Sequence, residues 1–329
     1  MNALVFLTRL CSTSRAVLLV AASGLLLIGD RLPAVDAVGA VKSSAGPPPP
    51  PVPAGVKAIR DIAYVKGGGP SQSLDLFVPE KADGPLPIVV WIPGGAWMHI
   101  NWRSDCRSLA WTTRGYAAAS ISYRTTAEDN ALWPAQIHDC KAAIRFLRAN
   151  AKKYNLDPNR IGVWGESAGG HLVSLLATSG GVQALEGDLG NEGVSSRVQA
   201  VCVWCGPSNF MTIDTPPGGL KVDEPLGPVG RLFGGPMHQR EALAKRASPI
   251  NYVTPNAPPF LIMHGEGDAT IPISQGRELF EALTKAQTSV KFEPLKGTGH
   301  PIDRPDRRAR VLDFFDEVFK VKQPEPNGK

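Results

Sequence analysis

The sequence predicts an α/β fold in which helices flank a mostly parallel central sheet. Short apolar stretches alternate with segments of helical periodicity, as in strand–helix–strand units. The run from Leu86 to Ile92 is apolar throughout, which is typical of a strand buried on both faces. The segment from Pro134 to Tyr154 instead carries one apolar stripe at spacings of three and four residues. With 329 residues, 43% of them hydrophobic, the chain can form one sizeable domain, or at most two.

Each expected element follows from its local pattern. A glycine-rich turn, Gly67-Gly68-Gly69-Pro70, separates two strand-like runs and predicts a hairpin. Pro134 stands near the start of the long helix, where proline is well tolerated. In chain order we expect strands 59–65, 73–77 and 86–92, a polar helix 105–113, strand 116–122, helix 134–154, strand 161–164 with a helix after it, strands 198–204 and 260–264, helix 275–285, strand 289–295 and helix 306–321.

The N-terminal residues resemble an export signal rather than part of the fold. Arg9 and Arg15 precede an apolar run from Ala16 to Ile28, which is short for a bilayer span. Small residues favour cleavage after Ala37, so residues 1–37 are predicted to be a signal peptide; an uncleaved membrane anchor is the alternative. We therefore expect a secreted or periplasmic protein without stable membrane insertion after cleavage. Residues 38–55, with Pro47 to Pro51, are predicted to form a proline-rich linker.

The expected folded domain covers residues 56–322, with a short tail at 323–329. Residues 206–250 interrupt the strand–helix alternation after the sixth expected strand. This segment is rich in Gly and Pro, yet it keeps many apolar residues, which argues against disorder. We predict a lid-like insertion beside the active site; a packed surface loop is the alternative.

Charge and cysteine content exclude some classes of function. The formal net charge is +5, and the basic residues are scattered among acidic ones, so no nucleic-acid surface is expected. Cys106, Cys140, Cys202 and Cys205 remain after signal removal. Cys202 and Cys205 fall on one predicted strand, three residues apart, and so would face opposite ways. Buried free thiols are favoured over disulfides.

The strongest motif is Gly165-Glu166-Ser167-Ala168-Gly169, which fits Gly-x-Ser-x-Gly. It lies between a short buried strand and a segment of helical periodicity, the context of a nucleophile elbow. Such a turn lifts the serine hydroxyl above the sheet edge. It also places the N–H of Ala168 at a helix N-terminus, where it can stabilise an anion.

A nucleophilic serine needs a base, and the base needs a group that orients it. His300 follows the last expected strand in a flexible loop and is the favoured base; His99 is the second candidate. Asp268 lies just past another strand and is the favoured orienting carboxylate. Glu266 and Asp303 are the fallback candidates for that role.

A second glycine loop, Pro93-Gly94-Gly95-Ala96-Trp97, directly follows the apolar strand 86–92. Its backbone N–H groups can point at a substrate oxygen. We assign Gly95 and Ala96, together with Ala168, as oxyanion donors. Trp97 either walls the acyl pocket or fills the core.

Together these motifs resemble the α/β-hydrolase superfamily, and more closely the secreted carboxylesterases of the bacterial ferulic-acid-esterase-like group, relatives of the hormone-sensitive lipase family. The resemblance also rests on 122–124 (Ser-Tyr-Arg), 157–161 (Asp-Pro-Asn-Arg-Ile), 169–172 (Gly-Gly-His-Leu) and 247–249 (Ala-Ser-Pro). One departure is Pro93, where related loops begin with histidine, so the anchoring of the loop must differ. The resemblance implies that Glu166 supports the site and is neither nucleophile nor acid.

The expected function is that of a serine carboxylesterase acting on a small-molecule or polymer-attached ester, with no metal or cofactor. A serine peptidase and a catalytically inactive hydrolase-fold binding module are the alternatives. Short-chain aliphatic, acetyl, feruloyl and other aryl esters are all compatible with these motifs, and no motif indicates an oligomeric state.

Overall fold

A computed structural model of the chain describes residues 48–213 and 219–321. The predicted signal peptide (1–37), the first part of the predicted linker (38–47) and the predicted tail (323–329) lie outside the described residues. The first strand of the described fold begins at Val56.

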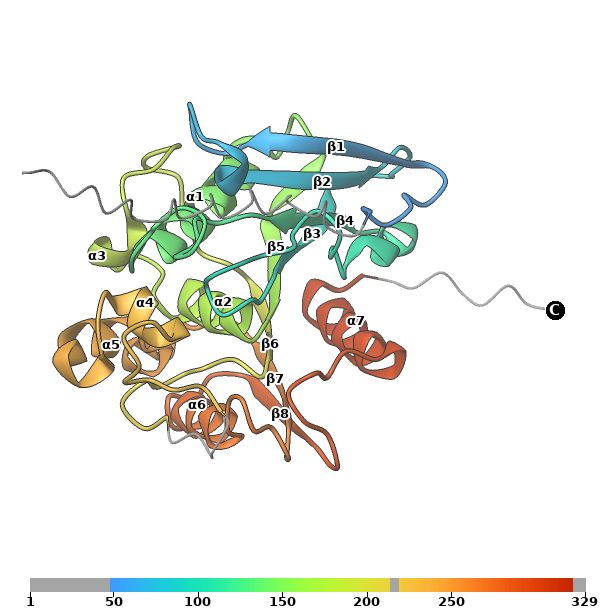
Figure 1. Cartoon of the computed structure of the whole chain (residues 1–329). Coiled ribbons are helices and arrows are strands. Elements are labelled where there is room, and N and C mark those ends of the chain that lie inside the picture. The colour runs from blue at the N-terminus through green and yellow to red at the C-terminus, as the bar shows by residue number, and fades with distance from the viewer. Residues whose placement is uncertain (1–47, 214–218, 322–329) are drawn as a thin grey trace, which may run out of the picture. The chain divides into compact units, whose positions relative to one another are not determined.

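The centre of the fold is an eight-stranded, mostly parallel sheet (Figure 1). Its strand order is β1-β2-β4-β3-β5-β6-β7-β8. The β1–β2 and β2–β4 pairs are antiparallel, and every other pair is parallel. The predicted sheet type is therefore confirmed. The strands are β1 Val56–Ala63, β2 Ser73–Pro79, β3 Leu86–Ile92, β4 Ala117–Ile121, β5 Leu156–Glu166, β6 Ala200–Trp204, β7 Phe260–Gly265 and β8 Val290–Leu295.

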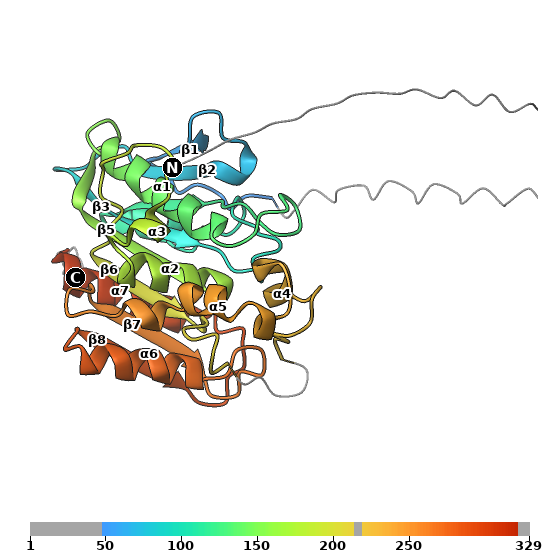
Figure 2. The same cartoon turned by 90° about the vertical axis from the view of Figure 1, so that its left-hand side faces the viewer.

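Helices cover both faces of this sheet, as Figures 1 and 2 show. Strand β3 illustrates why its sequence is apolar throughout. Val90 packs into the core formed with helices α1 and α2, whereas Val89 and Trp91 pack into the core formed with helix α7. The helices are α1 Ala135–Ala149, α2 Ala168–Thr178, α3 Gln183–Glu186, α4 Pro228–Phe233, α5 Glu241–Ala247, α6 Ser274–Lys285 and α7 Pro305–Phe319; 3₁₀ turns are η1 Pro70–Gln72, η2 Leu109–Arg114, η3 Met237–Gln239 and η4 Pro249–Tyr252.

Two predicted helices differ from the structure. The helix expected at 105–113 is replaced by the 3₁₀ turn η2, which begins only at Leu109. Arg107, before that turn, bonds instead to Glu166 of β5, so a tertiary contact determines the local backbone. The long helix ends at Ala149 rather than at Tyr154, because the chain turns there to enter β5 at Leu156.

The segment 206–250 follows β6, as predicted, but it is more regular than expected because it contains α4 and α5. Residues 214–218 within it lie outside the described residues. Phe210, Leu232 and Phe233 are buried in the core on the α2 side of the sheet, whereas Leu226 is 76% exposed. The segment is thus packed onto the domain along much of its length, and movement as a lid stays a prediction.

All four cysteines that remain after the predicted cleavage are buried and unpaired. Cys205 lies just past the end of β6, with a φ of 39°, and not on the strand as predicted. Among the described residues, no helix is long and apolar enough to cross a membrane.

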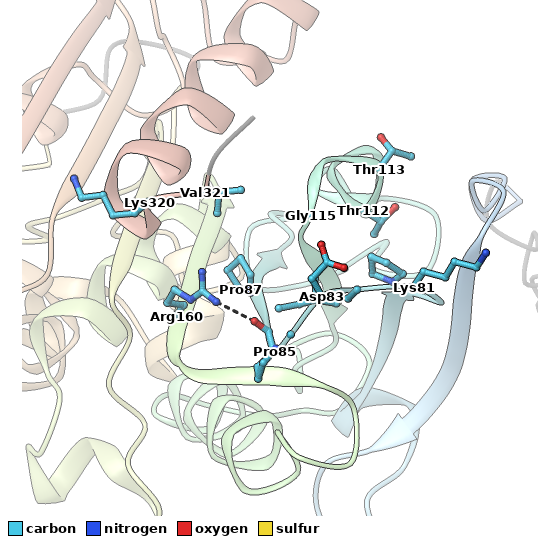
Figure 3. A pocket seen from close by; sticks show the side chains of 14 residues that line it. Lys81, Asp83, Pro85, Pro87, Thr112, Thr113, Gly115, Arg160, Lys320 and Val321 are labelled. Atoms are coloured by element: carbon cyan, nitrogen blue, oxygen red, sulfur yellow. Dashed lines mark hydrogen bonds between the residues drawn. The ribbon is translucent and has the colours of Figure 1, made fainter. Parts of the chain in front are cut away.

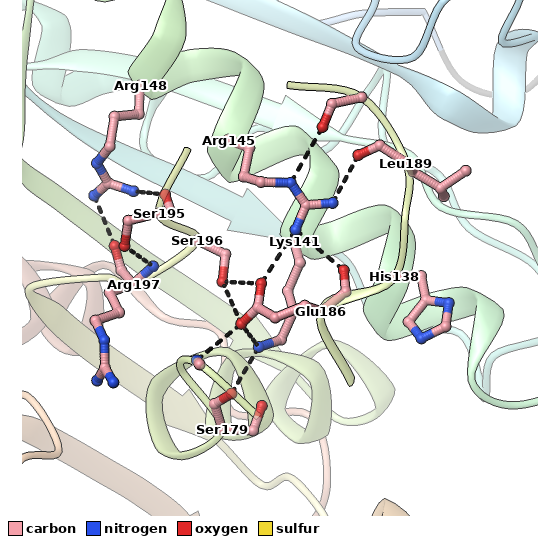
Figure 4. A network of polar contacts seen from close by, with 12 residues as sticks. His138, Lys141, Arg145, Arg148, Ser179, Glu186, Leu189, Ser195, Ser196 and Arg197 are labelled. Carbon is pink, nitrogen blue, oxygen red and sulfur yellow. Dashed lines mark hydrogen bonds and ion pairs between the residues drawn. The ribbon is translucent and has the colours of Figure 1, made fainter. Parts of the chain in front are cut away.

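A buried ion network joins α1 to the chain after α2 (Figure 4). The fully buried Lys141 donates from Nζ to the carbonyl of Ser179 at 2.8 Å and to Glu186 Oε1 at 2.7 Å. Arg145 Nη1 lies 3.1 Å from Glu186 Oε2. Ser196 donates its hydroxyl to the same carboxylate. Burial disfavours the charge of Glu186, but the contacts with Lys141, the Gly181 N–H and Ser196 together outweigh this and lower the pKa of Glu186.

A cavity of about 550 Å³ lies where β3 begins (Figure 3). Its lining includes Pro85, Thr112, Arg160 and Lys320. Arg160 is held by the carbonyl of Pro85, to which it donates at 2.9 Å. The candidate catalytic residues lie instead beyond the opposite, carboxyl ends of the parallel strands.

Candidate active site

Ser167 stands at the turn between β5 and α2. Its φ of 56° and ψ of −121° are unusual for a residue with a side chain, as a nucleophile elbow requires. The N–H of Ser167 donates to the carbonyl of Trp204 at 2.8 Å, which fixes the turn against β6. A Cβ on Gly169 would come within 2.0 Å of the carbonyl oxygen of Ile92. Only glycine allows α2 to approach β3 so closely, which explains the last residue of the motif.

His300 and Asp268 form a direct pair beside this turn. His300 Nδ1 lies 2.7 Å from Asp268 Oδ2. The other carboxylate oxygen, Oδ1, accepts from the backbone N–H groups of Thr270 at 2.9 Å and Ile271 at 2.8 Å. An ionised carboxylate only accepts, so Nδ1 of His300 carries the hydrogen and Nε2 is left free to accept a proton. The two predicted residues are therefore brought together in the orientation that general-base catalysis needs.

Asp268 remains ionised although it is buried. Burial alone would favour the neutral acid, but hydrogen bonds from His264 and His300 outweigh it and hold the pKa of Asp268 well below its usual range. His264 Nε2 lies 3.3 Å from Asp268 Oδ2 and 2.9 Å from the carbonyl of Ile271. His264, at the end of β7, thus bonds the loop that carries Asp268. The contact with Asp268 went unrecognised, although the two residues are only four apart across the strand end.

The Cys205 thiol links the serine turn to the histidine loop. Its Sγ lies 3.3 Å from the carbonyl oxygen of His300 and contacts the backbone N–H of Ser167. It also lies within 4.8 Å of side-chain atoms of both Asp268 and His300. Such spacing could suit a metal ion, but Asp268 and His300 already bond each other. Burial raises the pKa of Cys205, which keeps the thiol protonated and a poor metal ligand.

The predicted oxyanion loop lies against the elbow. A Cβ on Gly94 would meet the Glu166 carbonyl oxygen at 2.8 Å and the Ser167 Cβ at 3.2 Å, so the loop and the nucleophile are in contact. Gly95 has a φ of 120°, and a Cβ there would come within 1.7 Å of the His99 carbonyl oxygen. Ala96 continues the tight turn with a φ of 55°.

Three backbone amides near the nucleophile are free to bind an oxyanion. The N–H groups of Gly95, Ala96 and Ala168 have no hydrogen-bond acceptor within the part of the chain that the structure describes. The anchoring expected to differ at Pro93 is supplied by Tyr123. Its buried hydroxyl donates to the Pro93 carbonyl at 2.9 Å. The predicted donors are thus available, and their assignment stays a prediction.

Trp97 packs beneath this loop. Its indole is 1% exposed, and its Nε1 donates to His171 Nδ1 at 3.2 Å. The other ring nitrogen of His171 donates to the carbonyl of Ala247 at 2.7 Å. Burial lowers the pKa of His171 to about 4, so the ring stays neutral. This arrangement favours the core role of Trp97 over the pocket role, and it ties the oxyanion loop to α2 and the end of α5.

The remaining candidates make no hydrogen bond or ion pair with His300 among the described residues. His99 is exposed and lies 3.1 Å from Glu128, and Glu266 is exposed beside the Asp268 loop. Asp303 pairs with Arg308, and Glu166 pairs with Arg107 at 2.6 Å. Neither carboxylate bonds His300, so Asp268 is the orienting group that the structure provides. The ion pair between Arg107 and Glu166 was not predicted, because a single arginine in a polar segment gives no local signal.

Comparison with known proteins agrees with this geometry. The BD-FAE family model matches residues 74–283, which include Ser167 and Asp268. Esterase LipC of Mycobacterium tuberculosis is 34% identical over 79% of this chain and 66% of its own length. A truncated carbohydrate esterase from gut microbiota is similar at 31% identity, with a TM-score of 0.72 over 80% of this chain and 96% of that one. A bifunctional GH43-CE protein of Bacteroides eggerthii is 34% identical, with a TM-score of 0.71 over 79% of this chain and 38% of that one.

This chain spans only 56% to 66% of the length of the first curated relatives that it matches. The family match nevertheless extends over well over half of its residues, from β2 to α6, and includes the nucleophile turn. The chain therefore belongs to the BD-FAE family and has the α/β-hydrolase fold.

Proposed function

We propose that this protein is a serine carboxylesterase that hydrolyses carboxylic esters through an acyl-enzyme on Ser167. The observation that carries the proposal is the 2.7 Å contact between His300 Nδ1 and Asp268 Oδ2, next to a serine held at a strained elbow. The esterase identity of a relative such as LipC supports it.

The chemistry follows from the atoms available. His300 Nε2 takes the proton of the Ser167 hydroxyl while Oγ attacks the ester carbonyl carbon. Asp268 holds the ring through Nδ1 and stabilises the imidazolium that forms. The carbonyl oxygen becomes an oxyanion, which the amides of Gly95, Ala96 and Ala168 stabilise.

His300 then gives its proton to the departing alkoxide, which leaves as the alcohol. Water attacks the acyl-enzyme, with His300 again as the base. The acid is released and Ser167 regains its proton. Every proton transfer uses Nε2 of the His300 ring. Nδ1 must therefore keep its hydrogen and its contact with Asp268 throughout.

The substrate class that we propose is an acyl ester carried by a carbohydrate. Two solved structures above 30% identity to this chain are those of a carbohydrate esterase and a bifunctional GH43-CE protein. A panel with acetylated xylo-oligosaccharides, methyl ferulate and p-nitrophenyl esters of increasing acyl length tests this. Higher kcat/KM on simple aliphatic esters than on any carbohydrate ester would contradict it.

Export is a further part of the proposal, since the predicted signal peptide at 1–37 precedes the domain. N-terminal sequencing of the mature protein should begin at Val38. Recovery of Met1 on the mature protein would contradict cleavage.

Ser167→Ala tests the mechanism directly. Loss of a residue from a triad that acts as a unit should lower kcat by roughly 10⁴- to 10⁶-fold. A fluorophosphonate probe should label the wild-type protein at Ser167 and leave the variant unlabelled. Hydrolysis by Ser167→Ala at the wild-type rate would refute the assignment.

A further inference from the structure

Arg107 lies between the turn that carries Ser167 and the loop that carries His300. It lies in the segment between β3 and η2, and its side chain is only 12% exposed. The guanidinium carbon lies 4.4 Å from the centre of the Trp91 ring and 5.4 Å from that of Trp204. Aromatic rings attract a cation placed over their faces, and here they also limit its movement.

The nitrogens of this guanidinium face three carboxylates from different parts of the chain. Nη2 lies 2.6 Å from Glu166 Oε2, and Nε lies 3.2 Å from Asp105 Oδ1. Nε also lies 3.6 Å from Asp303 Oδ2. Arginine can make such contacts at once because its donors form a rigid, planar fork.

Two of these carboxylates belong to the catalytic loops. Glu166 is the residue immediately before Ser167, and Asp303 lies three residues after His300. Arg107 is therefore a bridge between the chain that carries the nucleophile and the chain that carries the base. Asp303 also pairs with Arg308 near the start of α7.

The charges in this cluster are matched to the proposed reaction. Among the described residues, Asp105, Glu166 and Asp303 form ion pairs with the guanidinium groups of Arg107 and Arg308. Burial raises the pKa of Glu166, and Arg107 opposes that effect; a protonated His300 also favours the ionised carboxylate. An ionised Glu166 therefore stabilises the imidazolium that forms during acylation, and Arg107 helps to keep it ionised.

We propose that Arg107 is a positioning residue for hydrolysis: it joins Glu166 beside Ser167 to Asp303 beside His300 and so holds the base against the nucleophile. This inference rests on the serine mechanism proposed above. Arg107 acts through these carboxylates and does not contact the reacting atoms.

The test compares Arg107→Met and Arg107→Lys with the matched control Arg308→Met. Arg308 also pairs with Asp303 but has no ion pair with Glu166 among the described residues, so its removal leaves the contacts of Arg107 with Glu166 and Asp303 in place. kcat and KM for p-nitrophenyl acetate are measured together with the thermal unfolding midpoint of each variant.

Displacement of a catalytic group by about 1 Å can cost about 100-fold in rate, so Arg107→Met should lower kcat about 10- to 100-fold with little change in KM. The kcat of Arg107→Lys should lie between those of Arg107→Met and wild type, because one ammonium group cannot make all the contacts of the planar guanidinium. Its retained charge and stem also make it the informative variant if Arg107→Met does not fold. Arg308→Met should keep kcat within about threefold of wild type, because the contacts of Arg107 with Glu166 and Asp303 remain.

A double-mutant cycle with Asp303→Asn separates bridging from general packing. Once Arg107→Met has broken the bridge, adding Asp303→Asn should slow the enzyme by less than about twofold more. Independent, multiplicative losses would overturn the proposal, as would wild-type kcat in Arg107→Lys or an equal loss in Arg308→Met. If Ser167→Ala is inactive and Arg107→Met is fully active, only the positioning role fails. Full activity of Ser167→Ala would instead refute the serine mechanism.

Discussion

The Lys141–Glu186 pair allows a stability prediction that can be worked out from the structure. Glu186→Gln keeps the shape of the side chain but leaves the ammonium of Lys141, which is fully buried, without a counter-charge. Lys141 would retain its bond to the Ser179 carbonyl, and Arg145 would retain its backbone acceptors at Leu189 and Gly190. Breaking a buried pair by removing one partner typically costs about 3–5 kcal/mol.

The pH dependence of this loss has a definite sign. Burial lowers the pKa of Lys141, while Glu186 opposes that effect, so Glu186→Gln should lower the pKa further. The variant can relieve the unpaired charge by releasing the Lys141 proton. That release costs about 5 kcal/mol at pH 7 and about 2 kcal/mol at pH 9, relative to an unfolded lysine. The destabilisation should therefore shrink to about 2 kcal/mol as the pH rises from 7 to 9.

The assay is thermal and urea-induced unfolding of wild type and variant at both pH values. A loss of about 3 kcal/mol corresponds to a fall of roughly 6–12 °C in the midpoint for a domain of this size. Glu317→Gln is the matched control because its pair with Lys291 is exposed, and it should leave the midpoint unchanged. A Glu186→Gln midpoint within about 2 °C of wild type at pH 7 would refute the reasoning.

Three further predictions concern the proposed active site. Asp268→Asn should lower kcat about 10⁴-fold at neutral pH, because an amide at this position favours the wrong His300 tautomer; a loss below tenfold in steady-state kinetics would contradict the orienting role. Gly95→Ala should abolish measurable turnover while the protein stays folded by circular dichroism, because the added Cβ would meet the His99 carbonyl at 1.7 Å. Tyr123→Phe removes the hydroxyl that holds the Pro93 carbonyl and should lower kcat about tenfold, with KM nearly constant, in the same ester assay. Unchanged kcat in Tyr123→Phe would show that the loop is held by other contacts.

The parts of the site that could be predicted have strong local signals. Ser167, Asp268 and His300 each follow a strand in a glycine-containing segment, and the carboxyl ends of parallel strands meet at one edge of a sheet. The parallel sheet could also be predicted from the sequence, because strands that are buried on both faces, such as β3, must be apolar throughout.

The errors occur where distant contacts determine local structure. Nothing in residues 105–113 indicates that Arg107 reaches across to Glu166 and Asp303, so a helix was predicted where the structure has a turn. The burial of Trp97 depends in the same way on His171 and Phe210, which come from α2 and the segment after β6. These contacts form only after the chain has folded, and no local pattern encodes them.

The central sheet also separates the side chains that support the site into two groups, and among the described residues no hydrogen bond or ion pair joins one group to the other. Trp97, His171 and Ala247 brace the oxyanion loop on the α2 side, whereas Arg107 and its carboxylates brace the elbow and the histidine loop on the α7 side. Free-energy changes at distant sites without shared partners usually add. Substitutions that reshape the surroundings of the oxyanion loop on one side should thus leave the alignment of His300 on the other side unchanged. If the proposed esterase activity holds, one set of candidate catalytic groups can serve several acyl substrates.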